Sequence, residues 1–291
     1  MNYFKDKMII ITKLKKFLEE YGFKEVYTPV LRGEGGDIIS RIHLENDIGY
    51  LRDSHELQLR WLLTKYDAIY EVGACFRNES VEKNNISRNE FLLMELFTSK
   101  MELFQIKEMI KKFILLEKPQ IIFEEISIAE KIKSDLGIDL FKNGEQERFF
   151  CRLKEKYSNV KFVHDYEYVL HYIENEVEPL SRGKVVFFTD YPECTCSYAK
   201  IKQGDVISRF ELFANGLEIA NGFDDECNPN LFVERNQKCP IFQNEEKEIV
   251  SSLLSGELPS SSGVGIGIER LCMFLFETVM IEDVLFPSKS F

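Results

Sequence analysis

The fold is decided by residues 70–97, which read YEVGACFRNESVEKNNISRNEFLLMELF. Apolar and polar side chains alternate from Tyr70 to Glu79, which is the period-two pattern of a half-buried strand. A polar segment, Ser80–Asn89, follows, and Glu90–Phe97 has the composition of a second strand. Together they predict an antiparallel hairpin with a long loop.

A second hairpin is predicted later in the chain, with strands at Ile207–Phe213 and Leu217–Phe223. The dipeptide between them, Asn215-Gly216, is a strong signal for a type I′ turn. Antiparallel hairpins with helices grouped between them are typical of an α+β fold and not of a doubly wound one.

The turn of the second hairpin brings two glutamates together. A two-residue turn pairs Phe213 with Glu218, and directly paired residues share a face. Glu211, two residues before Phe213, therefore lies on the face of Glu218, with Cβ atoms roughly 7–8 Å apart or less. Two carboxylates at that separation suit one Mg²⁺ or Mn²⁺ ion, since these ions prefer hard oxygen ligands. The alternative is a pair of solvated glutamates on an exposed strand.

A glycine-interrupted strand, Gly263–Gly267, leads into a helix that begins near Glu269. Alternate glycines leave one face of a strand bare, so a flat ligand or another backbone can approach closely. Arg270 at the helix start suits bidentate contact with phosphate. The spacing fits neither a Rossmann fingerprint nor a Walker loop. The alternative is tight helix–strand packing with Arg270 in an ion pair.

The first hairpin carries a third candidate group. Arg77 and Glu79 share the polar face of their strand, while Phe91, Glu95 and Phe97 share one parity on the return strand. An arginine beside an aromatic face suits a phosphate next to a purine ring. The alternative is ordinary sheet surface.

The other segments add elements but little chemistry. Residues 99–180 are mostly helical in pattern, with a Lys/Glu-rich surface. Further predictions are a helix over 6–20, a strand with Pro29 over 26–31, a helix over 54–65 with Ser54 as N-cap, a buried strand over 185–189, a turn at Asp190-Tyr191-Pro192 and a helix over 243–254.

Composition restricts the class of protein. The chain has 291 residues, a net charge of −12 and seven cysteines. No run of about 18 apolar residues is present, which predicts no membrane span, and the N-terminus lacks the apolar stretch of a signal peptide. An odd number of cysteines spread through the chain predicts reduced thiols in a cytoplasmic protein. The negative charge argues against a broad nucleic-acid surface. The cysteines Cys194, Cys196, Cys227 and Cys239 have no common zinc spacing, so free thiols are predicted. All four histidines lie outside the motifs and are predicted to be structural: His43, His55, His164 and His171.

Taken in order, these pieces resemble the three signature motifs of class II aminoacyl-tRNA synthetases. The motifs are Tyr21–Pro29 after the first helix, Phe76–Glu79 with Glu90–Glu95, and Gly263–Leu271. The subgroup most similar comprises the lysyl-tRNA synthetases and the elongation factor P–lysine ligases. That resemblance rests on Thr189–Pro192, Arg209–Phe213, Gly216–Phe223 and Ser261–Val264.

The resemblance implies a single catalytic domain over 1–291, with an antiparallel sheet flanked by helices, and a homodimer built on the first motif. It implies ATP as substrate and Mg²⁺ as metal, with formation of an aminoacyl-adenylate. Arg77 is expected to bind the α-phosphate and the amino-acid carboxylate, and Arg270 the γ-phosphate. Phe91 is expected to stack on adenine, with Glu79 near its amino group.

The remaining site residues follow from the same resemblance. Gly267 completes the ATP site, and Glu211 with Glu218 holds Mg²⁺. In the amino-acid pocket, Glu56 receives the α-amino group. Three further pocket positions complete the set: Phe97, Asn221 and Asp225.

The sequence departs from the family pattern in two places. Ser87, Arg88 and Asn89 stand where the family has a His and a Pro, and Arg88 is a candidate replacement contact to phosphate. Phe97 and Asp225 stand where the family holds a lysine ammonium with a Tyr and a Glu. Either lysine or another amino acid is therefore left open as the substrate. Strand parity also separates Asp225 from the face of Glu218 unless Gly222 forms a bulge.

The acceptor is predicted from the start of the chain. The first motif begins within about twenty residues of Met1, which leaves no room for the family's N-terminal anticodon-binding OB-fold. This favours a protein acceptor such as elongation factor P. The alternatives are a lysyl-tRNA synthetase-like paralogue serving tRNA, a carrier protein or a small-molecule pathway, and a non-catalytic regulatory paralogue. Retention of four charged site groups argues against the last: Arg77, Glu211, Glu218 and Arg270.

Overall fold

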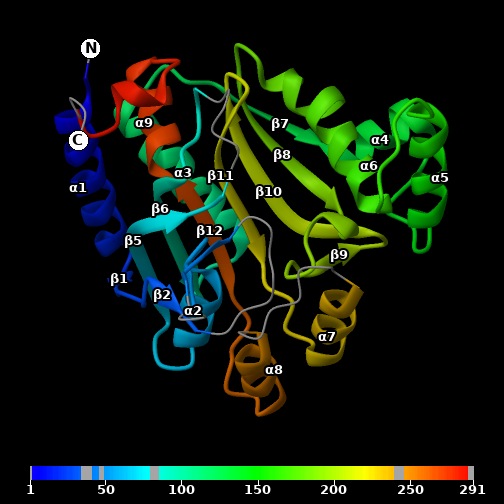
Figure 1. The fold of residues 1–291 in the computed structure, drawn as a ribbon, viewed down its shortest axis with the longest axis horizontal. Coiled ribbons are helices and arrows are strands. Elements are labelled where there is room, and N and C mark those ends of the chain that lie inside the picture. The colour runs from blue at the N-terminus through cyan, green and yellow to red at the C-terminus, as the bar shows by residue number, and fades with distance from the viewer. Residues whose placement is uncertain (1, 34–40, 46–48, 79–84, 239–245, 288–291) are drawn as a thin grey trace. The chain divides into compact units, whose positions relative to one another are not determined.

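The computed structural model describes residues 2–33, 41–45, 49–78, 85–238 and 246–287. The chain divides into two compact units, Met1–Gln120 with Cys227–Phe291, and Ile121–Glu226. The fold is α+β, as predicted, and each unit is built on strands covered by helices (Figure 1).

The strands of the first unit run in the order β1, β5, β6, β12. Strand β5 (Ala68–Phe76) pairs antiparallel with β6 (Glu90–Thr98), and β6 pairs antiparallel with β12 (Ser262–Gly267). Strand β1 (Lys24–Glu25) pairs parallel with β5. Because β6 has a neighbour on both sides, its residues from Leu93 to Thr98 are all buried.

Helices and a small second sheet complete this unit. Helix α1 (Phe4–Glu20) packs on β1 and on α9 (Ile268–Phe276), and α3 (Leu103–Glu117) packs on β12. The other elements are α2 (Glu56–Leu62), α7 (Pro229–Lys238), α8 (Glu246–Leu254), a 3₁₀ turn at Ile281–Asp283, and the strands β2 (Leu31–Arg32), β3 (Ile42–His43) and β4 (Tyr50–Leu51).

The strands of the second unit run in the order β11, β10, β8, β7, with β9 (Ile201–Gln203) also paired to β10. Strand β10 (Val206–Ala214) pairs antiparallel with β11 (Leu217–Asp224) and with β8 (Val185–Pro192). Strand β7 (Phe123–Ser127) pairs parallel with β8. Asn215 and Gly216 both have positive φ, at 52° and 80°, as a type I′ turn requires.

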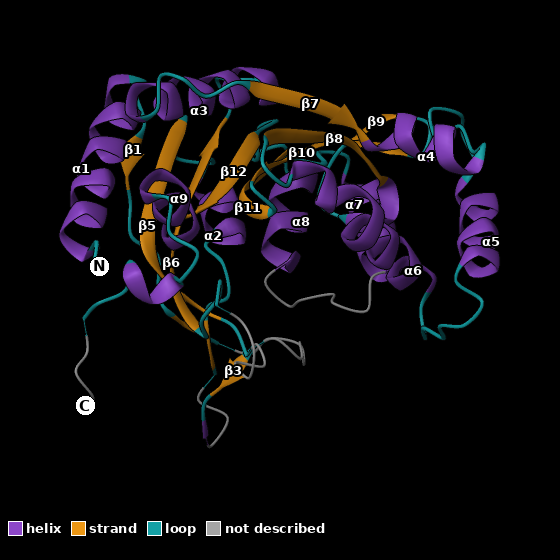
Figure 2. Cartoon of the chain, turned by 90° about the horizontal axis from the view of Figure 1, so that it is seen from above, coloured by secondary structure: helices purple, strands orange, loops and turns teal. Residues whose placement is uncertain are grey.

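Helices α4 (Ile128–Leu136), α5 (Gln146–Lys156) and α6 (Asp165–Tyr172) pack with these strands around one apolar core (Figure 2). A π-helical turn (Ile173–Val177) and 3₁₀ turns (Glu178–Ser181 and Glu193–Thr195) complete the unit. The largely helical pattern predicted for 99–180 is confirmed, with β7 as the exception. That short strand has two exposed residues, Glu124 and Glu125, between half-buried ones and so lacks a period-two pattern, and sequence pattern alone did not separate it from the flanking helices.

Three local predictions were wrong. Residues 26–31 do not form one strand, because the Thr28 N–H donates to the side chain of Glu71 (2.8 Å) and not to a neighbouring strand. Helix α2 begins at Glu56 and not at Ser54. The turn predicted at Asp190-Tyr191-Pro192 is instead part of β8, which accommodates Asp190 at φ +56°.

Candidate active site

The predicted site residues fall in both units, and those of each unit are described separately. In the first unit, the guanidinium of Arg77 lies 5.1 Å from the centroid of the Phe91 ring. Its Nε donates to the carbonyl of Asp53 at 3.3 Å. Arg77 directly follows β5 and Phe91 is the second residue of β6, so the antiparallel register brings them together. The predicted arginine beside an aromatic face is therefore present.

The other two predicted arginines of this unit both contact the segment that leads into β6. Arg270 Nε donates to the carbonyl of Ile86 at 3.4 Å, and Arg88 donates to the carbonyl of Ser87 at 2.5 Å. Arg88 also forms an ion pair with Glu282. The predicted adenine contact Glu79 lies outside the described residues.

Arg270 stands at the start of α9, and a buried ion pair fixes that helix. Glu269 is 4% exposed and accepts hydrogen bonds from Lys7 Nζ (3.1 Å) and from the Leu92 N–H (2.9 Å). The pair connects α1, α9 and β6, so Arg270 starts from a rigid frame. Sequence reasoning missed Lys7, although its place among the apolar positions of α1 was the available signal.

The bare face predicted for the glycines of β12 is filled by side chains of β6. A Cβ at Gly263 would lie 2.4 Å from the Phe97 ring, and one at Gly265 would lie 3.3 Å from the Glu95 carboxylate. The expected close approach of a ligand is therefore wrong at these two positions. At Gly267, the N-cap of α9, the nearest atoms are those of Arg270 at 3.8 Å and beyond.

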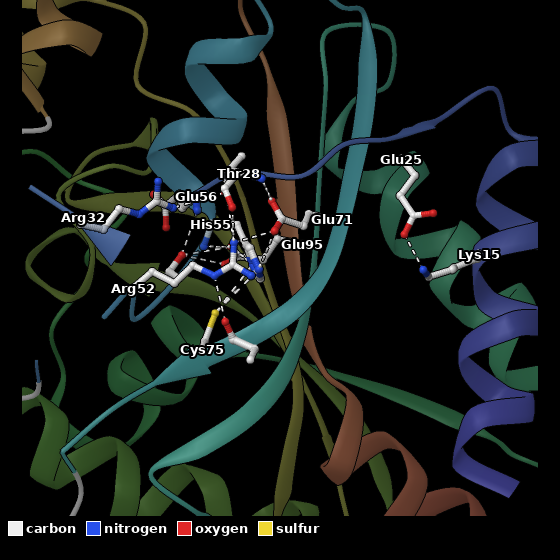
Figure 3. Close-up of polar contacts among 12 residues, drawn as sticks. Lys15, Glu25, Thr28, Arg32, Arg52, His55, Glu56, Glu71, Cys75 and Glu95 are labelled. Carbon is white, nitrogen blue, oxygen red and sulfur yellow. Dashed lines mark hydrogen bonds and ion pairs between the residues drawn. The ribbon is translucent and has the colours of Figure 1, made fainter. Parts of the chain in front are cut away.

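A buried polar network lies beneath the first hairpin (Figure 3). The side chain of Glu95 accepts hydrogen bonds from the Ser54 hydroxyl (2.9 Å) and from the N–H of His55 (2.5 Å). The Glu71 carboxylate binds Arg52 Nη1 at 2.5 Å. The face of β5 predicted to be polar is therefore buried, because internal partners satisfy it. Sequence reasoning missed this use of His55.

Ser54 links this network to the predicted amino-acid site. Its hydroxyl accepts the N–H of Glu56 at 3.0 Å, at the start of α2. Glu56 is half-buried and lies one residue beyond His55. Phe97 is 3% exposed against Gly263.

In the second unit, the register confirms the predicted pairing of Phe213 with Glu218. It also contains a bulge, because Leu212 pairs with Ala220 and leaves Ile219 as the extra residue. Glu211 is then directly opposite Asn221. Paired residues share a face, so the bulge places Asn221 on the face of Glu211 and Glu218.

The same bulge changes the position predicted for Asp225. Phe223 pairs with Arg209, and Asp225 lies two residues beyond Phe223. By strand alternation, Asp225 is therefore on the same face as Asn221. The bulge that puts Asp225 on the face of Glu218 lies at Ile219 and not at Gly222, where the sequence suggested it. Asp225 is 1% exposed and forms a bridge with Ala199.

Glu211 is held by two side chains that the sequence did not assign. The Tyr191 hydroxyl donates to it at 2.7 Å, and Arg209 forms an ion pair with it. Arg209 Nε also donates to Asn221 Oδ1 at 3.1 Å. Burial and the negative charge of Glu211 raise the pKa of Tyr191 well above its ordinary value, so this hydroxyl remains a donor.

The chemistry of this donor set fits a divalent cation. Mg²⁺ is usually held by one or two carboxylates together with substrate phosphates. Glu211 and Glu218 supply two such carboxylates on one face. Within the described part of the chain, no group of three or more His, Cys, Asp or Glu side chains is arranged to hold a metal. A two-carboxylate site is the arrangement that these residues suit.

The cysteines of the described residues are free thiols, as predicted: Cys75, Cys151, Cys194, Cys196, Cys227 and Cys272. Burial raises the pKa of Cys194 to about 12, which keeps this thiol protonated. Cys239, the fourth residue of the zinc alternative, lies outside the described residues.

Comparison with known proteins agrees with the geometry. The family model for tRNA synthetases class II (D, K and N) matches residues 1–290. The chain belongs to this family. The resemblance inferred from the three motifs is therefore confirmed over nearly the whole chain.

Relatives within this class II family include several lysine–tRNA ligases. That of Mycoplasmoides gallisepticum is 30% identical over 95% of this chain and 62% of its own length. Those of Gloeobacter violaceus and Saccharolobus solfataricus are 27% and 28% identical, over 98% and 97% of this chain and 64% and 63% of their own lengths. The chain thus spans a little under two thirds of each of these relatives. Among the described residues, no helix has both the length and the apolar character needed to span a membrane.

Proposed function

We propose that this class II synthetase domain uses ATP to activate an amino acid as its adenylate, with lysine as the first candidate. The observation that carries the proposal is the guanidinium of Arg77 set 5.1 Å from the ring of Phe91 on the paired strand. An aromatic platform next to a fixed cation suits a purine next to its phosphates. The family match over 1–290 supports the same conclusion.

The proposed reaction needs little proton transfer. A carboxylate oxygen of the amino acid attacks the α-phosphorus of ATP, the new P–O bond forms, and the bond to the bridging oxygen breaks to release pyrophosphate. The nucleophile is already ionised, so the protein contributes orientation and charge neutralisation. Arg77 binds the α-phosphate and the substrate carboxylate, and Arg270 binds the γ-phosphate. Glu56 receives the α-amino group.

Further residues complete the proposed site. Phe91 stacks on adenine, while Glu79, Arg88 and Gly267 border the nucleotide. Phe97, Asn221 and Asp225 border the amino acid.

Glu211 and Glu218 are the proposed holders of Mg²⁺, which when bound neutralises charge on the ATP phosphates. Tyr191 and Arg209 fix the orientation of Glu211. A carboxylate that is already hydrogen-bonded and oriented loses less freedom when a ligand binds it.

The acceptor proposed first is tRNA. The sequence taken by itself favoured a protein acceptor such as elongation factor P, but the relatives compared above carry the name lysine–tRNA ligase. A protein acceptor is the second candidate, and it rests on the similarity of Ser261–Val264 to the elongation factor P–lysine ligases.

The first test is ATP–pyrophosphate exchange by the purified protein, with each standard amino acid and with β-lysine. Exchange that depends on lysine is the expected result, and R270A should abolish it. The matched control is R152A, which removes an exposed arginine of α5 that pairs with Glu155. Absence of exchange with every amino acid, in protein shown to be folded, contradicts the proposal. Transfer to total tRNA and to elongation factor P then separates the two acceptors.

A further inference from the structure

The side chain of His55 lies between two carboxylates from neighbouring strands (Figure 3). It is fully buried, with Nδ1 3.1 Å from Glu95 and Nε2 3.6 Å from Glu71. Glu71 of β5 and Glu95 of β6 are directly opposite one another in the strand register. Like charges directly opposite are destabilising, so this pair requires cations beside it.

The two ring nitrogens indicate which form of the imidazole fits. A neutral imidazole has one donor and one acceptor nitrogen, whereas the imidazolium has two donors. With a carboxylate beside each nitrogen, the neutral form would direct a lone pair at one of them. The imidazolium and Arg52 together balance the charges of Glu71 and Glu95, so these four groups sum to zero.

The Cys75 thiol and the Glu95 carboxylate complete the surroundings of the ring. The Cys75 sulfur lies 3.8 and 3.9 Å from the two ring nitrogens, and burial raises the pKa of this thiol, so it remains neutral. Burial alone would raise the pKa of Glu95, but hydrogen bonds from His55 and Ser54 outweigh it and lower this pKa. Asp53 and Arg77 are the next charges that act on Cys75.

The network continues directly into the predicted site. The carbonyl of Asp53 accepts a hydrogen bond from Arg77, and Ser54 and His55 donate hydrogen bonds to Glu95. Glu56 is the next residue along the chain. Residues 53–56 therefore include Glu56, one predicted contact to the amino acid, and they support Arg77, another. Their attachment to β6 is the side chain of Glu95.

We propose that His55 is a positioning residue which, in its doubly protonated form, holds residues 53–56 against Glu95 and so sets Glu56 and Arg77 for the amino acid. The proposal rests on the proposed function for the identity of the bound substrate. Loss of the proton releases one carboxylate contact and loss of the ring releases both, and either change loosens the segment.

The protonation state is tested directly by ¹⁵N NMR of protein labelled at histidine. The chain has four histidines, and H55Q assigns the signal of the buried one. Two protonated ring nitrogens at neutral pH are the expected result. A neutral tautomer for His55 overturns the proposal, whether or not the protein is active.

The positioning role is tested by pyrophosphate exchange. For H55Q we expect KM for the amino acid to rise about tenfold, the size expected from losing a hydrogen bond to a charged group, with KM for ATP within about twofold. H55N keeps a donor near the place of Nδ1 and should recover part of the loss. The exposed His43 provides the matched control H43Q, which should behave as wild type.

Each other outcome overturns a stated claim. If wild type shows exchange and H55Q keeps its amino-acid KM, the role of His55 is wrong and the proposed function stands. Wild-type protein without exchange overturns the proposed function and this role together. If H55Q does not fold, S54A replaces it, because it removes the hydroxyl contacts to Glu95 and keeps the ring. An unchanged amino-acid KM in folded S54A then overturns the proposal.

Discussion

The two units each contain a pair of glutamates on neighbouring antiparallel strands, and the pairs differ in their surroundings. Glu71 and Glu95 are directly opposite, and Arg52 and His55 lie beside them. In the second unit, Glu218 is opposite Phe213 and therefore diagonal to Glu211, and Arg209 pairs with Glu211. With His55 doubly protonated, as proposed, the charges of the first cluster sum to zero, whereas those of Glu211, Glu218 and Arg209 sum to −1. The same residue type thus forms an internal support in one place and a candidate cation site in the other.

The largest expected effect is on folding, and it separates the two pairs. E71A leaves the buried Arg52 without its carboxylate, which typically costs about 3–5 kcal/mol. E218A removes a half-buried carboxylate and should cost well under half as much. Urea unfolding of both variants measures the difference. Equal losses would remove the distinction between the pairs.

The second effect is on activity, and here the second pair of glutamates should be the more sensitive one. E211Q should lower amino-acid-dependent exchange by about 100-fold, the scale seen when an electrostatic partner of a reacting phosphate or oxyanion is lost. The Mg²⁺ concentration needed for half-maximal exchange should be higher in E211Q than in wild type, whereas in E95Q it should match wild type. A Mg²⁺ titration of the exchange rate checks both. An E211Q protein with wild-type Mg²⁺ dependence would exclude Glu211 as a ligand.

A third change crowds Arg52 and His55, the side chains beside the first pair of glutamates, without removing a charged group. A Cβ at Gly73 would lie 2.2 Å from Arg52 Nη2 and 3.1 Å from His55 Nε2. G73A should therefore destabilise the protein by about 1–3 kcal/mol, as overpacking generally does. G33A is the control, because no atom lies within 4 Å of its added Cβ. Thermal unfolding that is equal in the two variants would show that the network adapts easily.

The smallest effect is the acid dependence of stability. The pKa of Glu95 is lowered in the folded protein, so the unfolded chain binds the proton more readily. Its contribution is complete above the ordinary carboxyl pKa and is lost as the pH falls through the lowered value. The stability gap between wild type and E95Q should therefore close on acidification. A gap that persists in urea titrations at low pH would show that another interaction of Glu95 dominates.

Much of the fold followed from local signals. Alternation predicted β5, the run after the polar segment predicted β6, and Asn215-Gly216 predicted the second hairpin with its turn type. The burial of Glu71 on the polar face of β5 could not be predicted from the sequence, because alternation shows which residues are polar and not where a polar group finds partners. Glu71 is 1% exposed since Thr28, Arg52 and His55 reach it from segments far along the chain.

The site followed the same division. The sequence by itself determined which charged and aromatic groups are available and that Glu211 and Glu218 share a face, because strand parity and a two-residue turn act over a few residues. Only the tertiary structure decided that Ile219 bulges, that Phe97 fills the space over Gly263, and that His55 stands between two carboxylates. These outcomes depend on burial and charge pairing between segments distant in sequence, which no local pattern encodes.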